Sequence, residues 1–181
     1  MKTVKPKVSL IAYTRPIEKF QKKYSETDIE TFVVALARST RTTEDLDKIY
    51  LETLEDVATE KNIKMYMALK HFTVFEFIDF TFEISGISRA CGNELVRHRT
   101  ATYLQQSQRH VDLRDRGVIV PPSIHSNIVN EEAMEQTDKL WRANYIFMVD
   151  VNGVPKEDAR FLAPNSIETR VIMKIDGRNL L

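Results

Sequence analysis

Two segments far apart in the chain alternate apolar and polar side chains with a period of two residues. The first covers residues 78–84 and the second covers residues 167–175. This alternation is typical of a half-buried strand, because successive side chains point to opposite faces of a sheet. Short apolar runs at Val8–Tyr13 and Val118–Val120 predict two more strands. Ser85-Gly86 is predicted to end the strand over 78–84.

Stretches with helical periodicity lie between these strands. Apolar spacing predicts helices at about 29–37, 45–69 with a break near Asn62, 87–95, 130–151 and 155–162. Residues that commonly cap or end helices lie at the predicted helix ends. These residues are Ser25, Thr27, Gly153, Pro155 and Asp176. Asp176 is placed to cap one further helix. The pattern predicts one α+β domain over 1–181, with a mainly antiparallel sheet flanked by helices.

The bulk composition limits the kinds of partner. The 181 residues include 26 basic and 26 acidic side chains, so the formal net charge is zero. A neutral chain gives no reason to expect a nucleic acid or an anionic membrane as partner. The single cysteine, Cys91, excludes an internal disulfide framework and a multi-cysteine metal site, and no metal is expected. We expect a cytoplasmic protein, since no signal peptide or membrane span is evident.

The stretch Arg97–Arg109 concentrates cationic and hydroxyl side chains. It reads Arg-His-Arg, then seven residues, then Ser107, and Arg109 follows two positions later. Guanidinium groups match phosphate and carboxylate oxygens, so the stretch predicts an anion-binding site, and the alternative is a solvated basic surface. Ser107 is not predicted to be a nucleophile, because the sequence places no acid–base partner near it.

This order resembles the diagnostic motif of the flavin-dependent thymidylate synthases, the ThyX family. Three further segments resemble family elements in the family's order along the chain. His71–Phe77 resembles H-E-T-P-F-E-H, Val154–Arg160 resembles V-P-x-E-x-A-R, and Asp176–Leu180 resembles N-x-R-x-L. The chain is therefore identified as a member of this family.

The resemblance implies an activity and its partners. It implies that dUMP, methylenetetrahydrofolate and NADPH yield dTMP, with FAD carrying the hydride, in a methyltransferase of nucleotide biosynthesis. The family's α+β proteins are oligomeric, and a homotetramer whose sites combine residues of several subunits is expected here.

The resemblance also assigns site residues. Those expected to bind the flavin are Ser39, His71, Thr73, Glu76, Arg97, His98, Arg99, Asp176 and Arg178. Those expected to bind dUMP are Glu94, Arg97, Gln105, Gln106, Ser107, Gln108, Arg109 and Arg160, with Ser107, Arg109 and Arg160 on its phosphate.

For three side chains, the sequence supports predictions that do not depend on the family resemblance. Glu76 shares the parity of Ile78 and Phe80, so its carboxylate is predicted to point to the apolar side and to need a partner there. A role as a cap or as a core histidine explains His71 about as well as a flavin contact does. Cys91 shares a predicted helical stripe with Ile87 and Leu95, which predicts a core residue and not a nucleophile.

Several positions depart from the family pattern. Glu94 stands where the family has Gln, Leu104-Gln105 replaces Asn-Glu, and Asp176 replaces Asn. The family's uracil-activating Arg lies in a C-terminal segment that would follow Leu181, so no catalytic residue is assigned. The sequence is interpreted as part of a longer protein, and the alternative is a family member that lacks this segment. Two alternatives remain, a non-catalytic member that binds FAD and nucleotide, and an RNA-binding module, which the zero net charge disfavours.

Overall fold

The computed structural model describes residues 1–16, 29–56 and 58–181. The chain divides into two compact units. Unit 1 contains Met1–Ser9 and Phe82–Met173, and unit 2 contains Leu10–Thr81 and Lys174–Leu181. The capping boxes predicted at Ser25 and Thr27 fall on residues outside the described ranges.

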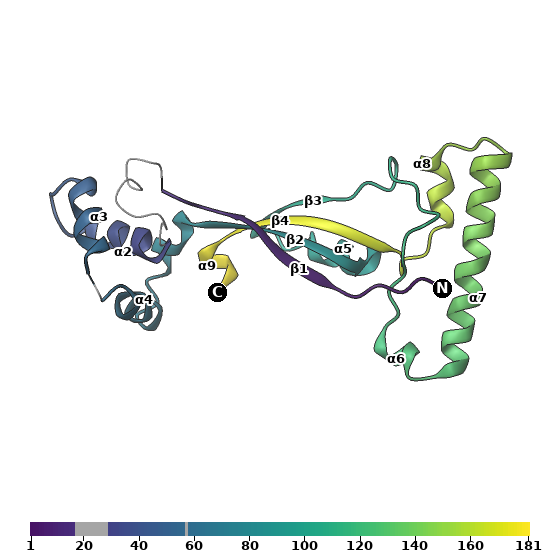
Figure 1. The fold of residues 1–181 in the computed structure, drawn as a ribbon, viewed down its shortest axis with the longest axis horizontal. Helices are drawn as coiled ribbons and strands as arrows, with labels where there is room; N and C mark the ends of the chain where they lie inside the picture. Colours follow the sequence, from purple (N-terminus) through teal and green to yellow (C-terminus); the bar gives the residue numbers. More distant parts are fainter. Residues whose placement is uncertain (17–28, 57) are drawn as a thin grey trace. The chain divides into compact units, whose positions relative to one another are not determined.

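A four-stranded antiparallel sheet has the strand order β1-β2-β4-β3 (Figure 1). Its strands are β1 (Lys7–Tyr13), β2 (Asp79–Ser88), β3 (Ala101–Gln105) and β4 (Glu168–Asp176). The predicted α+β class and antiparallel sheet are thereby confirmed. The expected third strand at Val118–Val120 is reduced to isolated bridges, in which Val118 pairs with Thr3 and with Ile167.

Unit 1 contains the longest helix, α7 (Ile128–Ile146), which continues into the π-helical turn η2 (Phe147–Val151). Trp141 and Tyr145 on α7 are buried against Leu113, Ala159 and Ile167. A second cluster joins Ile84, Ile87 and Val171 of the sheet. The other helices of this unit are α5 (Arg89–Leu95), α6 (Pro122–His125), α8 (Lys156–Ala159) and the 3₁₀ turn η3 (Arg160–Leu162).

Unit 2 is built around α2 (Ile29–Ser39), one side of which packs on α3 (Leu46–Leu54). Val33, Val34 and Ala37 of α2 form the main core with residues of α4 (Thr59–Ala68) and the 3₁₀ helix η1 (Phe72–Phe77). The last element, α9 (Gly177–Leu180), packs on η1, and the Asp176 side chain accepts a hydrogen bond from the backbone N–H of Asn179 (2.9 Å). The predicted cap at Asp176 is confirmed.

Several predicted boundaries were wrong. The helix predicted over 45–69 is two helices that separate after Leu54, and Asn62 lies inside α4. Strand β2 continues through Gly86 to Ser88, because glycine tolerates the φ of +65° found there. Helix α7 begins after Asn127, whose side chain accepts hydrogen bonds from the N–H groups of residues 129 and 130. Pro155 is the N-cap of α8 and not its first residue.

Candidate functional site

The Arg-His-Arg motif lies in the turn that follows α5. The Ser88 hydroxyl caps the start of this helix by accepting a hydrogen bond from the Cys91 N–H (3.0 Å). After the helix ends, Arg97 donates to both carboxylate oxygens of Glu94, at 3.0 and 3.1 Å. A ring nitrogen of His98 lies 3.1 Å from the carbonyl oxygen of Leu95. All three motif side chains are exposed, and Arg99 makes no ion pair within the described residues.

Strand β3 and the first residue after it lead from the motif to the predicted phosphate-binding residues. The Gln105 side chain is held against α5, and its buried Nε2 has no hydrogen-bond partner among the described residues. Gln106 is fixed at three atoms. Its N–H donates to the Arg170 carbonyl (2.8 Å), its carbonyl accepts from Arg89 (3.3 Å), and its side-chain oxygen accepts from Arg116. By contrast, Leu104 is 72% exposed and Gln108 is half-buried.

Arg109 and Arg160, which are distant in sequence, both contact Glu157, and the Ser107 hydroxyl contacts the backbone of Arg109. The Ser107 hydroxyl oxygen accepts a hydrogen bond from the Arg109 N–H (3.2 Å). The Arg109 guanidinium donates to Glu157 Oε2 from Nε (2.9 Å) and from Nη2 (2.7 Å). Arg160 Nε donates to the Glu157 carbonyl oxygen (2.8 Å). Two cations and a hydroxyl thus lie within one small region of unit 1.

The electrostatics of this region follow from these contacts. The hydrogen bond from Arg109 and its positive charge lower the pKa of Glu157, and the charges of Arg160 and His110 act in the same direction. Burial lowers the pKa of Arg89, and the nearby positive charge of Arg160 lowers it further. Because neighbouring cations repel one another, an anion bound in this region would relieve that repulsion.

A second network holds the loop that contains Ser107 and Arg109. Asp112 accepts hydrogen bonds from the N–H and the Nε of Arg114 (both 3.0 Å), and Lys156 Nζ lies 3.1 Å from its other oxygen. Arg114 also donates to both oxygens of Asp150, at 2.9 and 3.0 Å. Burial alone would raise the Asp112 pKa, but the hydrogen bonds from Arg114 and Lys156 lower it to about 2. The loop is therefore fastened to η2 and α8 by paired charges.

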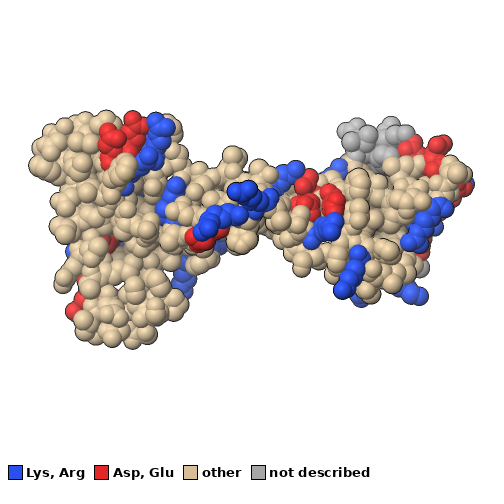
Figure 2. All heavy atoms as spheres, turned by 180° about the vertical axis from the view of Figure 1, so that it is seen from behind, with Lys and Arg blue, Asp and Glu red and all other residues tan. Residues whose placement is uncertain are grey.

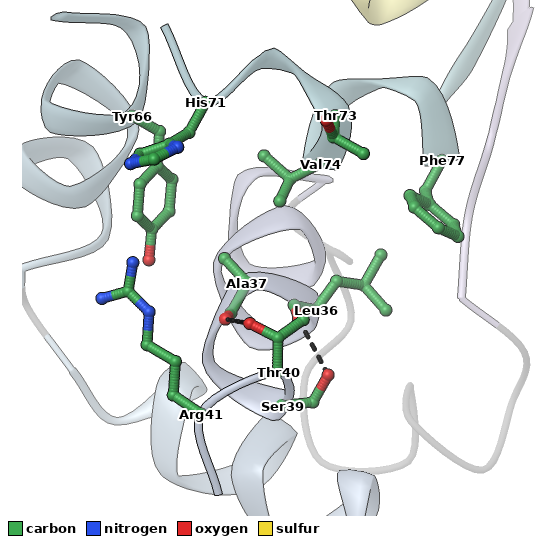
Figure 3. Close-up of a pocket in the computed structure, with 10 residues that line it drawn as sticks. All are labelled: Leu36, Ala37, Ser39, Thr40, Arg41, Tyr66, His71, Thr73, Val74 and Phe77. Atoms are coloured by element: carbon green, nitrogen blue, oxygen red, sulfur yellow. Dashed lines mark hydrogen bonds between the residues drawn. The ribbon is translucent and has the colours of Figure 1, made fainter. Parts of the chain in front are cut away.

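Unit 2 contains a pocket of about 540 Å³ that includes three of the residues predicted to contact the flavin (Figure 3). Ser39, His71 and Thr73 line it, together with apolar side chains of α2 and η1. The hydroxyls of Ser39 and Thr40 donate to carbonyls of the last turn of α2, at 2.8 and 2.9 Å. His71 is exposed, so the explanation as a core histidine was wrong. It occupies the N-cap position of η1, but its side chain makes no capping hydrogen bond there.

The last predicted flavin contacts, Glu76 and Arg178, form an ion pair within unit 2. Glu76 was predicted to point to the apolar side, which is wrong. It lies on η1 and not on β2, so the two-residue alternation of the strand does not extend to it, and its side chain is exposed. Arg178 and Asp176 both lie at the start of α9, which packs on η1.

Cys91 was predicted to fill the core, and this is also wrong. Its thiol is exposed, because α5 begins only at Arg89 and the side of the helix that faces inward contains Gly92 and not Cys91. Ile87, which the same helical stripe included, belongs to β2. Sequence reasoning also missed Arg41 and Tyr66 in the pocket and Glu157 beside Arg109. For Glu157, its place in the V-P-x-E-x-A-R match was an available signal.

Charges of both signs are distributed over the surface. Figure 2 shows acidic and basic side chains interspersed over the face that it draws, and the whole chain has 26 residues of each sign. No described helix is both long enough and apolar enough to span a bilayer. Among the described residues, no group of three or more His, Cys, Asp or Glu side chains is arranged to hold a metal ion.

Clustered arginines, as in unit 1, and an apolar pocket with a few hydroxyl groups, as in unit 2, are typical features of proteins that bind phosphorylated organic ligands. The fold is similar to that of the UMP/dUMP methylase PolB from Streptomyces cacaoi, solved with 5-Br dUMP. The TM-score is 0.74 at 19% identity, and the match covers 98% of this chain and 75% of that one.

The chain belongs to the ThyX family of flavin-dependent thymidylate synthases. The family model described as "Thymidylate synthase complementing protein" matches residues 22–181. The flavin-dependent thymidylate synthase of Geobacter sulfurreducens is 44% identical over 117 residues, which cover 64% of this chain and 50% of that protein. The enzyme of the same name from Clostridium tetani is 31% identical over 195 residues, covering 99% and 73%. The chain spans about half the length of relatives such as the Geobacter protein and that of Pyrococcus furiosus.

Proposed function

We propose that this chain is a flavin-dependent thymidylate synthase that methylates dUMP to dTMP. Methylenetetrahydrofolate is the one-carbon donor and NADPH is the reductant, and bound FAD would supply the chemistry that carries the hydride from NADPH to the nucleotide. The observation that most supports this proposal is the convergence of Arg109 and Arg160 on Glu157, next to the Ser107 hydroxyl. The relatives named above have this activity in their names.

In this proposal the dUMP phosphate binds between Arg109 and Arg160. Two guanidinium groups match the charge of a phosphate dianion, and Ser107 adds a neutral hydrogen bond. When the nucleotide binds, the Arg109 guanidinium releases the Glu157 carboxylate and donates to the phosphate instead. The other proposed substrate contacts belong to the same region, since they precede or surround Ser107 on α5, β3 and the loop. They are Glu94, Arg97, Gln105, Gln106 and Gln108.

The pocket of unit 2 fits part of a flavin dinucleotide. Its volume of about 540 Å³ lies within the range of ligand sites, and its apolar side chains suit an aromatic ring system. In unit 2 the proposed flavin contacts are Ser39, His71, Thr73, Glu76, Asp176 and Arg178. In unit 1 the residues proposed to contact a flavin are Arg97, His98 and Arg99. Bound FAD supplies the hydride chemistry, while these residues hold and orient it.

Exposed apolar side chains support the proposed homotetramer. Along α7 and η2 they are Ile128, Val129, Leu140, Ile146, Phe147 and Val151. A helix with this many exposed apolar residues is suited to an interface between subunits. We propose a cytoplasmic tetramer whose sites combine residues of more than one subunit. Light scattering on the purified protein tests the tetrameric state.

The test of function is dTMP formation by the purified full-length protein with dUMP, methylenetetrahydrofolate, NADPH and FAD. Omission of any one component should abolish the product. The Glu94–Arg97 pair favours the alternative of a non-catalytic FAD- and nucleotide-binding member, because it engages an arginine of the motif. That alternative predicts measurable binding of FAD and dUMP with no dTMP formed. A protein that neither binds FAD and dUMP nor forms dTMP would contradict both the proposed function and this alternative.

A further inference from the structure

One cation in the pocket of unit 2 is not explained by the contacts within the fold. Arg38 and Arg41 flank Ser39 and Thr40 at the end of α2. Arg38 donates to Thr53 Oγ1 (3.3 Å) and to Asp56 (3.4 Å), so it joins α2 to the end of α3. Arg41 lines the pocket instead, and its guanidinium makes no ion pair within the described residues.

Two acidic side chains that share a second hollow with Arg41 are engaged by another cation. Glu44 and Glu52 line this hollow, which is smaller than the main pocket, at about 240 Å³. Lys48 pairs with Glu44 and lies 3.8 Å from Glu52. The positive charge of Arg41 therefore remains available to an anion in the main pocket.

Figure 3 shows how the polar groups of the pocket are arranged. The Arg41 guanidinium extends toward the Tyr66 hydroxyl, and the His71 ring lies beside the Tyr66 ring. Leu36, Val74 and Phe77 form an apolar wall away from this cationic edge. The buried ring of Tyr66 fixes the position of its hydroxyl, which can donate a further hydrogen bond.

We infer that Arg41, assisted by the Tyr66 hydroxyl, binds a phosphate group of the flavin nucleotide in this pocket. The inference rests on the proposed function, since it takes FAD as the ligand. A guanidinium and a phenol donate to phosphate oxygens, and neither has an equally strong interaction with an uncharged flavin ring. The apolar wall then contacts an uncharged part of the same ligand.

The test compares three flavins that differ in their phosphate groups. Dissociation constants for FAD, FMN and riboflavin are measured by flavin fluorescence on the full-length protein and its Arg41→Gln, Arg41→Lys and Tyr66→Phe variants. Arg41→Gln should weaken FAD binding by about tenfold to a hundredfold and leave riboflavin within about twofold. Arg41→Lys should recover part of the loss because it restores the charge. Lys64→Gln, which removes an exposed cation of α4, is the matched control and should change neither ligand.

The outcomes separate this inference from the proposed function. A wild-type protein that binds none of the flavins contradicts the proposed function. If the wild type binds FAD and Arg41→Gln binds it equally well, Arg41 does not contact the phosphate. Equal weakening of FAD and riboflavin overturns the inference as well, because the substitution then acts on the ring site or on the fold. FMN distinguishes the two phosphates of FAD, since its affinity falls with that of FAD only if Arg41 binds the phosphate next to the ribityl chain.

Discussion

Arg109 and Glu157 form a two-bond ion pair across 48 residues of sequence, with Nη2 and Nε of the arginine 2.7 and 2.9 Å from one carboxylate oxygen. The pair joins the loop after β3 to α8. Arg160 donates to the backbone carbonyl of the same glutamate, so both arginines contact Glu157. The hydrogen bond and the positive charge of Arg109 lower the pKa of Glu157. The carboxylate orients Arg109, and its negative charge repels an incoming phosphate.

Arg109→Ala should weaken dUMP binding by about tenfold to a hundredfold, because a charge-assisted hydrogen bond to the phosphate is lost. Deoxyuridine has no phosphate, so its dissociation constant should change by less than about threefold. Isothermal titration at one fixed ionic strength measures both, since salt screens the contact. The control Lys139→Ala removes an exposed cation of α7 and should affect neither ligand. Equal weakening of both ligands would show that Arg109 does not bind the phosphate.

The exposed pair between Glu94 and Arg97 leads to opposite predictions for its two members. Arg97→Ala should weaken FAD binding by about tenfold, because it removes a cation of the proposed flavin site. Glu94→Gln introduces the residue common in the family and releases Arg97 from its carboxylate, so it should maintain or strengthen FAD binding. Fluorescence titration with FAD distinguishes the two variants. A loss as large for Glu94→Gln as for Arg97→Ala would mean that the carboxylate positions the arginine.

Much of the fold could be predicted because its signals are local. The alternation over 167–175 and the cap at Asp176 concern neighbouring residues, and the structure has β4 and α9 at these places. The failures concern places where the periodicity changes. The parity argument for Glu76 assumed a strand, but the backbone turns through a 3₁₀ helix before β2 begins. The start of α5 was predicted two residues too early, so Cys91 was assigned to the buried side of the helix, whereas its side chain is exposed.

The site was predictable only in part from local patterns. Motif spacing indicated Arg109 and Arg160, but their meeting at Glu157 depends on how α8 packs beside the loop after β3. Arg41 could not be distinguished from Arg38 by sequence, because each lies close to Ser39. Only the tertiary structure shows that Arg38 pairs with Asp56 whereas Arg41 lines the pocket.

Gly86 and Gly153 provide a matched pair of substitutions. Both have a φ of +65°, which is unfavourable for residues with a Cβ. At Gly86 a Cβ would lie 2.0 Å from the Lys5 carbonyl oxygen, whereas at Gly153 no atom lies within 4 Å. Gly153→Ala should therefore lower the free energy of unfolding by about 1 kcal/mol, and Gly86→Ala by about 3 kcal/mol or more. Urea denaturation measures both values. Equal losses would mean that β1 moves freely away from β2 at this point.

Asp112 should make the stability of the protein depend on pH in strongly acidic solution. Its pKa is about 2 in the folded state, below the usual value of about 3.9 for an unfolded chain. A depressed pKa adds stability that is fully present above the unfolded value and is lost as the pH falls through the folded value. The free energy of unfolding should therefore decrease between about pH 4 and pH 2 because Arg114 and Lys156 lose a charged partner.

Asp112→Asn tests this assignment. The variant should be less stable than the wild type at pH 7, by about 1 kcal/mol once solvent screening is considered, and the difference should shrink toward pH 2. Chemical denaturation at pH 7, 4 and 2.5 gives the three comparisons. Asp115→Asn is the control, because this exposed side chain makes no ion pair within the described residues, so its effect should be small at every pH. A difference between wild type and Asp112→Asn that stays constant from pH 7 to 2.5 would mean that the loop is held by packing and not by the charge of Asp112.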